Sequence, residues 1–204
     1  MIDSDTYLTI KAFSQGFYRE KGSRFVALAY PVTSAGEIKT ILEKARKEYH
    51  DARHHCFAYI LGQKRETWRI SDDGEPSGTA GKPILGQINS YGLTNILIIV
   101  IRYFGGRLLG VSGLINAYRS AAASAIVNGE IIKMTIHEFF KLEFPYLSMN
   151  DVMKIIKDEG IIQSDQKFEE ICRMTISFRR SSSERILYLL SQIEGLKYTY
   201  SHTF

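Results

Sequence analysis

The apolar run Ile96-Leu-Ile-Ile-Val-Ile101 constrains the fold of this sequence more than any other feature. It has the length of a strand, and it lacks the alternation of polar and apolar residues that a solvated sheet face would impose. A strand of this kind is buried on both of its faces. We therefore expect the segment from Asn95 to Arg102 to be the central strand of a sheet.

The segments around this strand alternate between strand and helix patterns. Residues 7–32 predict a hairpin that turns near Lys21-Gly22-Ser23. Ser34 and Glu37 predict a capping box for an amphipathic helix that reaches Tyr49. The remaining predicted elements are strands over 54–61 and 67–70, a helix over 83–91 and, after the glycine-bearing loop 103–113, a helix that ends at Asn128-Gly129.

The last third of the chain follows a different order. A strand over 135–146 precedes a helix that starts after Ser148, its predicted N-cap, and stops at Gly160. Strands over 161–167 and 171–179 follow, and then a helix with a Ser181/Glu184 capping box and a strand over 196–204. The order β-α-β-β-α-β is that of the ferredoxin-like split unit. We expect two α+β domains, residues 1–132 and 133–204, because 204 residues exceed the usual size of one domain.

The composition is that of an ordinary globular protein. Hydrophobic residues make up 45% of the sequence and charged residues 24%. No stretch approaches the roughly 20 apolar residues of a membrane span, and Met1 to Ile10 has neither a basic leader nor an apolar run. The only two cysteines, Cys56 and Cys172, lie far apart, which excludes a disulfide framework and a CxxC pair. We expect a cytoplasmic protein that does not enter a membrane.

The positive charge is concentrated in the first predicted domain. Residues 1–132 contain 16 Lys and Arg against 12 Asp and Glu, whereas residues 133–204 contain 10 of each. The whole excess of the net charge of +4 therefore belongs to the first domain. This distribution favours an anionic partner for that domain, although a modest excess also serves solubility.

The first of three polar motifs is Asp51-Ala-Arg-His-His-Cys56. Neighbouring residues of a strand point to opposite faces, so His54 and Cys56 share one face and His55 points away. A zinc site would need two further ligands, and the other histidines do not group near this motif. We expect no bound metal. The motif fits a structural pair of histidines, or a Cys/His nucleophilic couple.

The second motif spans residues 71–83 and is a long polar stretch before a helix. It contains three carboxylates, two hydroxyl groups and an ammonium group: Asp72, Asp73, Glu75, Ser77, Thr79 and Lys82. Carboxylates at this density could hold Mg²⁺ or act as acid and base. The alternative is a polar turn that also caps the following helix. A loop of this length is uncommon and often functional, so both interpretations stay open.

The third motif is the loop from Gly105-Gly106 to Gly113. Glycine amides at the start of a helix can receive an anion, and Arg102 and Arg107 would supply positive charge. The spacing matches neither the Walker pattern nor GxGxxG, so it predicts no nucleotide cofactor. Glycines that permit a tight reversal from strand to helix are an equally good explanation.

Together, these three motifs resemble the IMPACT family, whose bacterial members are the YigZ-like proteins. The resemblance rests on the segments 51–56, 71–83 and 102–106, with Leu109-Gly110, Gly113-Leu114 and Ala117-Tyr118. It implies a first domain with the ribosomal protein S5 domain 2-like fold, and a second domain similar to a ferredoxin-like domain of translation elongation factors. Eukaryotic members regulate translation through an additional N-terminal domain, so the resemblance does not transfer their partner.

The chain departs from the family pattern in the third motif. Where relatives often have lysine, glycine and arginine, it has Leu108, Ser112 and Asn116. These replacements remove two positive charges, which Arg107 and Arg119 compensate only in part. They weaken the interpretation of the loop as an anion site.

Three functions remain open at this stage. The first is a translation-related regulatory protein that binds RNA, a ribosome or a translation factor, with no cofactor. Its predicted binding residues are Arg53, His54, His55, Ser77, Thr79, Lys82, Arg102, Gly105, Gly106 and Arg107. The second is a hydrolase or transferase with candidate catalytic residues His54, Cys56, Asp72, Asp73 and Glu75. The third is a protein-interaction scaffold. We favour binding over catalysis, and the argument requires the three motifs to converge on one accessible surface.

Overall fold

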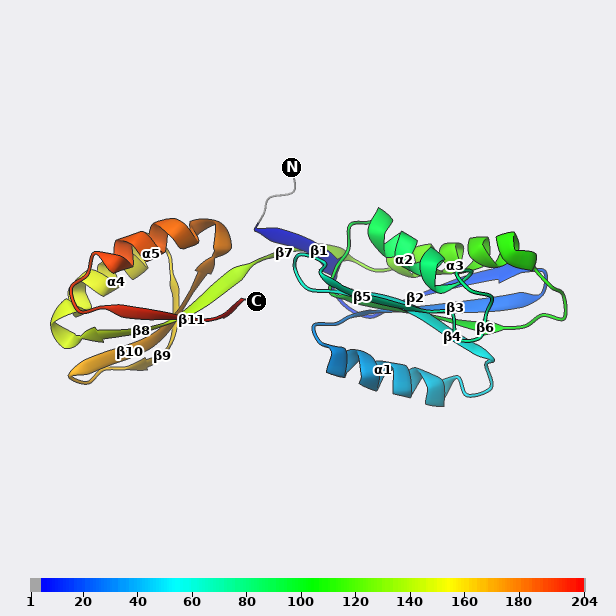
Figure 1. Ribbon diagram of the computed structural model, residues 1–204, viewed down its shortest axis with the longest axis horizontal. Helices are drawn as coiled ribbons and strands as arrows, with labels where there is room; N and C mark the ends of the chain where they lie inside the picture. Colours follow the sequence, from blue (N-terminus) through cyan, green and yellow to red (C-terminus); the bar gives the residue numbers. More distant parts are fainter. Residues whose placement is uncertain (1–4, 204) are drawn as a thin grey trace. The chain divides into compact units, whose positions relative to one another are not determined.

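The computed structural model describes residues 5–203, which form two units. One unit comprises Tyr7–Met134, and the other comprises residues 135–203 together with Asp5 and Thr6. Figure 1 shows that both units combine helices with sheets. The predicted α+β fold is therefore confirmed. The prediction about the leader segment falls largely on residues 1–4, which, like Phe204, lie outside the described residues.

The larger unit is built on a five-stranded sheet with the order β2-β3-β6-β4-β5. These strands are β2 (Ser14–Glu20), β3 (Ser23–Pro31), β4 (His54–Leu61), β5 (Thr67–Ser71) and β6 (Ile96–Tyr103). All the neighbouring pairs are antiparallel. β6 is the central strand, and its residues from Ile96 to Ile101 are fully buried. The prediction from the apolar run is confirmed.

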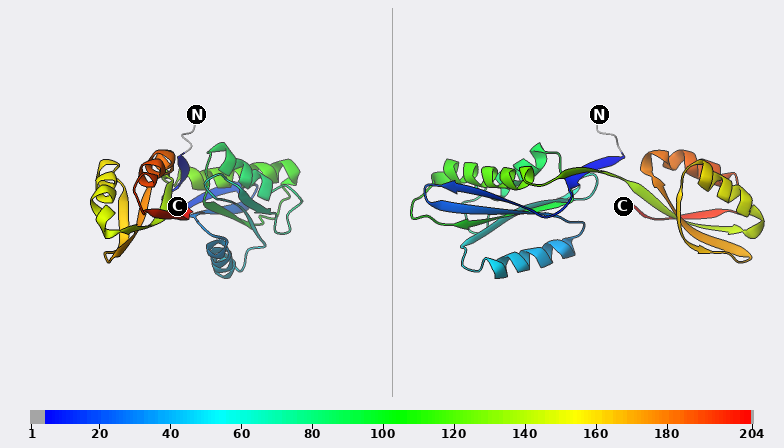
Figure 2. Two further views of the ribbon diagram at one scale, coloured as in Figure 1. Left: turned by 60° about the vertical axis from the view of Figure 1, so that its left-hand side comes forward. Right: turned by 180° about the vertical axis from the view of Figure 1, so that it is seen from behind.

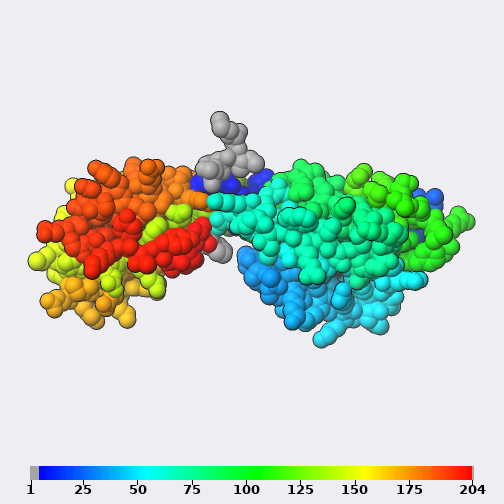
Figure 3. All heavy atoms as spheres, in the orientation of Figure 1, coloured from blue at the N-terminus to red at the C-terminus, as the bar shows by residue number. Residues whose placement is uncertain are grey.

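Helices cover both faces of this sheet. Helix α1 (Ala35–Glu48) lies on one face, and α2 (Gly81–Ser90) and α3 (Gly110–Val127) lie on the other, as Figures 1 and 2 show. Each face has its own apolar core, one containing Ile38 of α1 and the other containing Ile84 and Tyr118 of α2 and α3. In the space-filling view, the cyan-to-green segment that runs from β5 into α2 covers much of the near side of the unit (Figure 3). This segment includes the second polar motif.

Two of the predicted strands have different bounds in the structure. The hairpin predicted over 7–32 consists of β2 and β3 alone, because β1 (Thr6–Ile10) pairs instead with β7 (Ile131–Thr135). The strand predicted over 135–146 begins after β7, as β8 (His137–Pro145). Pairing between residues more than 100 positions apart in the chain is not visible in local patterns. The helices α2 and α3 also begin two and four residues before Pro83 and Leu114, respectively, where apolar periodicity becomes visible.

The smaller unit has the predicted element order. It contains β8, α4 (Met149–Asp158), β9 (Ile162–Lys167), β10 (Ile171–Arg179), α5 (Ser183–Ser191) and β11 (Lys197–Thr203). Short 3-10 turns, Tyr146–Ser148 and Arg180–Ser182, precede the two helices. The antiparallel sheet has the order β11-β8-β10-β9, and α4 and α5 pack on one of its faces (Figure 1). The edge strand β11, red in Figure 3, is exposed along nearly its whole length.

The predicted helix caps had different outcomes. The capping box of Ser34 and Glu37 is present, which confirms that prediction. The Ser181/Glu184 capping box is wrong, because α5 begins at Ser183 and the Ser181 hydroxyl donates to the Asp5 carboxylate at 2.6 Å. Ser148 occupies the N-cap position of α4, but its hydroxyl donates to the carbonyl of Glu194 rather than capping the helix. Among residues 5–203, no helix has the length and apolar character needed to cross a membrane.

Candidate functional site

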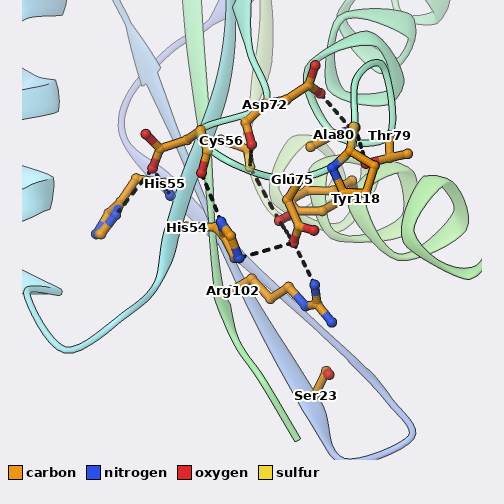
Figure 4. A network of polar contacts seen from close by, with 12 residues as sticks. Ser23, His54, His55, Cys56, Asp72, Glu75, Thr79, Ala80, Arg102 and Tyr118 are labelled. Carbon is orange, nitrogen blue, oxygen red and sulfur yellow. Dashed lines mark hydrogen bonds and ion pairs between the residues drawn. The ribbon is translucent and has the colours of Figure 1, made fainter. Parts of the chain in front are cut away.

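The three polar motifs converge at one end of the five-stranded sheet. His54 starts β4, and it lies opposite Arg102, near the end of β6. The turn that follows β5 brings Glu75 to the same place, and α3 contributes Tyr118. Figure 4 shows that these side chains point toward one another. The motifs therefore converge as the functional hypotheses require, but Glu75, Arg102 and Tyr118 are buried, so these side chains do not form the accessible surface that the hypotheses also require.

The carboxylate of Glu75 lies at the centre of this network. Its Oε1 accepts hydrogen bonds from Arg102 Nη1 at 2.7 Å and from the Tyr118 hydroxyl at 2.8 Å, and His54 Nε2 is 4.0 Å away. The side chains of Glu75 and Arg102 are only 3% and 8% exposed, so the ion pair is nearly removed from water. A buried charge is tolerated only with such partners. Glu75 therefore joins the acidic turn to β6 and α3.

The acidic turn is held mainly by the side chain of Asp72. Its carboxylate accepts from the backbone N–H groups of Gly78, Ala80 and Gly81 at 2.8 to 3.0 Å, the last two of which begin α2. Burial opposes ionisation, but these three bonds and the nearby Lys82 keep the pKa of Asp72 below its ordinary value. The carboxylate is thus an anionic helix cap. The geometry favours the turn-and-cap interpretation for this residue over metal binding.

Asp73 and Gly74 form the tip of this turn. Both have positive φ values, +40° and +87°, as in a type I′ turn, and the N–H of Glu75 donates to the carbonyl of Asp72. The Asp73 carboxylate accepts from the backbone N–H of His55 at 2.7 Å and pairs with Arg46 on α1 at 3.3 Å. The turn is therefore tied to β4 from both its backbone and its side chains.

The two histidines face opposite sides of the sheet, as alternation predicted. His54 Nδ1 lies 2.8 Å from the carbonyl of Asp73, and His55 Nε2 lies 3.1 Å from the carbonyl of Tyr49. A carbonyl can only accept, so each of these ring nitrogens carries the hydrogen. In its neutral form, His54 then has its lone pair on Nε2, the atom that faces Glu75. His54 is the more accessible of the two, with 15% of its side chain exposed.

Cys56 is fully buried between the acidic turn and α3. Its Sγ is 3.0 Å from the carbonyl of Asp72 and 3.3 Å from the Tyr118 hydroxyl. Burial, reinforced by the carboxylates of Glu75, Asp73 and Asp72, raises the pKa of the Cys56 thiol far above its ordinary value. Burial likewise raises the pKa of Tyr118. Both groups stay protonated at neutral pH, which disfavours Cys56 as a nucleophile.

The glycine loop after β6 contacts the β2–β3 hairpin turn directly. A Cβ atom on Gly105 would lie 1.9 Å from the carbonyl carbon of Gly22, so no larger residue fits there. The N–H of Gly105 donates to the hydroxyl of the buried Ser23 at 3.2 Å. Gly106 has open space around it and is required only for its φ of +83°. The glycines thus serve chain reversal and close backbone contact.

The predicted site residues divide into a buried and an exposed set. His54, His55, Cys56, Glu75, Thr79 and Arg102 are buried or nearly so, and Asp72 and Asp73 are partly exposed. The exposed set, whose members take no part in the network, is Arg53, Ser77, Lys82, Gly106 and Arg107. The residues missed as site members are Tyr118 and Ser23. Tyr118 stands on the small-residue face of α3 and could have been noticed there as a large polar residue among alanines.

The network offers little to a metal ion. Across residues 5–203, no group of three or more His, Cys, Asp or Glu side chains has the arrangement of a metal site. The oxygens of Asp72 are occupied by backbone N–H groups, and those of Asp73 by His55 and Arg46. These carboxylates therefore stabilise the fold at this end of the sheet.

Comparison with known proteins agrees with the motifs. Residues 21–126, more than half of the chain, match the family model described as the Impact N-terminal domain. The chain belongs to the IMPACT family. The matched region includes every residue of the polar network and no residue of the smaller unit. The family domain and the larger unit therefore largely coincide.

Named relatives extend over most of the chain. The IMPACT family member YigZ of Escherichia coli strain K12 is 34% identical over 160 residues, which cover 76% of this chain and 78% of that protein. An IMPACT family member of Haemophilus influenzae is 31% identical over 169 residues, covering 80% and 81%. The resemblance to YigZ-like proteins inferred from the three motifs is confirmed.

A solved structure supports the fold of this IMPACT family chain. The crystal structure of a hypothetical protein is similar with a TM-score of 0.70 and 26% identity, covering 97% of this chain and 98% of that one. The likeness therefore includes both units. The assignments to the ribosomal protein S5 domain 2-like and ferredoxin-like groups stay predictions.

Proposed function

We propose that this protein is a translation-related regulator that binds RNA through an exposed surface of its larger unit, beside the buried polar network. Membership of the IMPACT family supports the link to translation. The observation that carries the RNA proposal is a group of cations and aromatic rings at the turn end of the β2–β3 hairpin and at the end of β6 with the loop that follows it. We call it the hairpin surface, and its members are Arg19, Lys21, Arg24, Tyr103, Phe104 and Arg107.

Contact between the two loops brings these residues onto one part of the molecule. The β2–β3 turn and the loop after β6 meet at Gly105, and Arg107 follows two residues later. A hollow of about 440 Å³ is lined by residues 19–24 and Tyr103. Phosphates could enter it and contact the arginine and lysine side chains. The hollow also contains Glu20, whose carboxylate is engaged by the Tyr18 hydroxyl.

The aromatic rings add a second element of recognition. Phe104 is 54% exposed, and the Cζ of Arg102 lies 5.7 Å from its ring centroid on the inner side. The guanidinium of Arg24 lies 4.3 Å from the ring centroid of Tyr103. Arg102 is buried, so the groups open to a ligand are the exposed ring of Phe104 and the exposed guanidinium of Arg24. Unpaired RNA bases stack on such rings, and phosphates contact such cations. The buried network, on this account, holds the two loops in position.

The experiment is a fluorescence anisotropy titration of the full chain with a labelled RNA hairpin at two salt concentrations. Binding should weaken as salt rises, because phosphate contacts release counterions. The variant Arg24→Gln/Arg107→Gln should bind several-fold more weakly, and its salt dependence should be shallower. The matched control Lys39→Gln/Lys44→Gln removes the same charge from exposed positions of α1. Equal affinity for both variants, or no binding at low salt, would contradict the proposal.

A second candidate function has one specific observation in its favour. His54 presents an unprotonated Nε2 in its neutral form, is oriented by the carbonyl of Asp73 and is partly exposed. These are properties of a general base in a hydrolase or transferase. A broad substrate screen in which His54→Ala and Asp73→Ala keep the fold and full activity would exclude this candidate.

A further inference from the structure

The smaller unit has a sheet face that no helix of that unit covers. Helices α4 and α5 pack on the side of Phe140, Leu142 and Phe144, and the alternate residues of the strands point the other way (Figures 1 and 2). We call this second side the open face. The register gives three rows across the strand order β11-β8-β10-β9: His202, Phe139, Ser177 and Ile162; Thr199, Lys141, Thr175 and Ser164; Lys197, Glu143, Arg173 and Lys167.

The charges of these rows are strongly unequal. The rows contain four cations, Lys141, Lys167, Arg173 and Lys197, and one carboxylate, Glu143. Glu143 pairs with Arg173 at 2.8 Å and also lies opposite Lys197, so the rows keep an excess of three positive charges. Residues 133–204 contain equal numbers of basic and acidic residues. The positive excess on the open face therefore arises because most acidic residues of the unit lie elsewhere. An anionic partner complements it.

One row also presents aromatic rings. The rings of Phe139 and His202 are stacked, with centroids 4.3 Å apart and planes within 10° of parallel. On the other side of Phe139 the next strand contributes Ser177, which is small, and the strand after it contributes the exposed Ile162. Ser177 itself is only 6% exposed, so the accessible parts of this row are the ring pair of Phe139 and His202 and the side chain of Ile162. An unpaired base can stack on such a ring pair.

The other exposed aromatics of the unit do not belong to this face. Tyr198 and Tyr200 lie on the helix side of β11, and their ring centroids are 6.1 and 5.6 Å from that of Phe140. They pack on the core rather than forming a platform. Phe168 is exposed in the turn between β9 and β10, outside the three rows.

From the stacked rings and the three lysines, we propose that the open face binds single-stranded nucleic acid, with bases stacking at Phe139 and phosphates contacting Lys141, Lys167 and Lys197. Stacking on sheet aromatics requires bases that are not paired, which excludes an intact duplex. Lys197 and Lys141 are on the neighbouring strands β11 and β8, and Lys167 is on the opposite edge strand β9, so a nucleic-acid backbone that contacts all three would cross the sheet. The site is independent of the hairpin surface because it is built entirely within the smaller unit.

The test uses the full chain with the substitutions Arg24→Gln/Arg107→Gln as the background, so that the hairpin surface contributes little. A labelled oligouridylate of roughly ten nucleotides is titrated by anisotropy, with a duplex RNA as the comparison. Phe139→Leu should weaken binding about tenfold, as expected for the loss of one stacked base. Lys141→Gln/Lys197→Gln should lower the slope of log Kd against log salt by about 1.4, or about 0.7 for each lost phosphate contact.

Matched controls keep this result interpretable. Tyr198→Leu removes an aromatic from the helix side of the same sheet, and Lys154→Gln/Lys157→Gln removes two exposed charges from α4. Both should bind like the background protein, and Cys172, buried in the core of the unit, should stay unreactive to thiol reagents in every folded variant. Unchanged affinity in folded Phe139→Leu and in Lys141→Gln/Lys197→Gln would overturn the proposal. Equal affinity for duplex and single strand would also overturn it. Failure of the hairpin surface to bind structured RNA would leave this result unaffected.

Discussion

The two units place their polar groups in opposite ways. In the larger unit, several polar residues of the sequence motifs are buried, and Glu75, Arg102 and Tyr118 form a hydrogen-bonded network there. In the smaller unit, the main apolar core contains no charged residue, Asp5 is buried at its edge, and four cations lie on the open face. A dense polar motif can therefore serve to stabilise the fold. A segment without any recognisable motif can form a surface suited to binding.

The difference has a physical basis. A carboxylate taken out of water must be fully paired, so it is fixed to specific partners and shapes the loops that carry them. A lysine on an open sheet face keeps its hydration and can exchange water for a phosphate. In each unit a carboxylate accepts backbone hydrogen bonds just before a helix, Asp72 at the start of α2 and Asp5 at Ser181, before α5. Only the larger unit extends this into a network.

The largest expected effect comes from breaking the buried ion pair. Glu75→Ala leaves Arg102 and Tyr118 without their acceptor, so the free energy of unfolding should fall by about 3–5 kcal/mol. Urea denaturation followed by the fluorescence of Trp68, the only tryptophan and a residue of β5, reports on the larger unit. Each unit also has one buried cysteine. Thiol labelling should accelerate at Cys56 and not at Cys172, and equal acceleration at both would contradict the separation of the two units.

A second effect should arise from backbone packing. Gly105→Ala forces a methyl group into the backbone of Gly22 and should cost about 1–3 kcal/mol of unfolding free energy. In the smaller unit, Gly160 has open space and a φ of +62°, so Gly160→Ala should cost only about 1 kcal/mol from strain. Both values come from urea denaturation. If Gly105→Ala were the milder of the two, the hairpin and the glycine loop would not be in contact as described.

The loss of stability at acid pH should depend on a different carboxylate in each unit, Asp72 in the larger unit and Asp5 in the smaller one. Burial opposes ionisation of Asp5 and Asp72, but their hydrogen bonds keep the pKa of each below its ordinary value. As pH falls, these two carboxylates take up protons in the unfolded chain before they do so in the folded chain. Their contribution to the free energy of unfolding is therefore complete above about pH 4, and it is lost as pH falls through the pKa of the folded state.

The variants separate these contributions. Asp72→Asn should flatten the acid dependence of the larger unit alone, and Asp5→Asn that of the smaller unit alone. Hydrogen exchange measured on peptides from each unit between pH 5 and pH 3, with rates corrected for intrinsic pH dependence, checks this. A loss confined to the wrong unit would refute the assignment of either carboxylate.

The smallest effect is expected at the exposed ion pair of the open face. Arg173 and Glu143 are each more than half exposed, so solvent screens their attraction. Arg173→Ala should leave the urea midpoint of the smaller unit unchanged within error, in contrast to Glu75→Ala. A loss as large as that from the buried pair would show that the open face is part of the core.

The sequence predicted those features that depend on neighbours in the chain. The apolar run 96–101 identified the central strand, and the capping box of Ser34 and Glu37 is formed within four residues. What it could not predict depends on contacts between distant segments. Ser181 was assigned to a local cap, yet it bonds to Asp5, 176 positions away. The functional hypotheses required the motifs to converge on an accessible surface, but the sequence could not predict their burial, because accessibility is a property of the assembled layers.

The central claim is that the buried network holds the loops while the exposed hairpin surface binds RNA. Hydrogen exchange of the full chain, measured with and without a structured RNA, tests it directly. We predict slower exchange with RNA in residues 19–24 and 103–109, and unchanged exchange in residues 54–56 and 72–80. Slower exchange confined to residues 54–56 and 72–80, with residues 19–24 and 103–109 unaffected, would contradict the account.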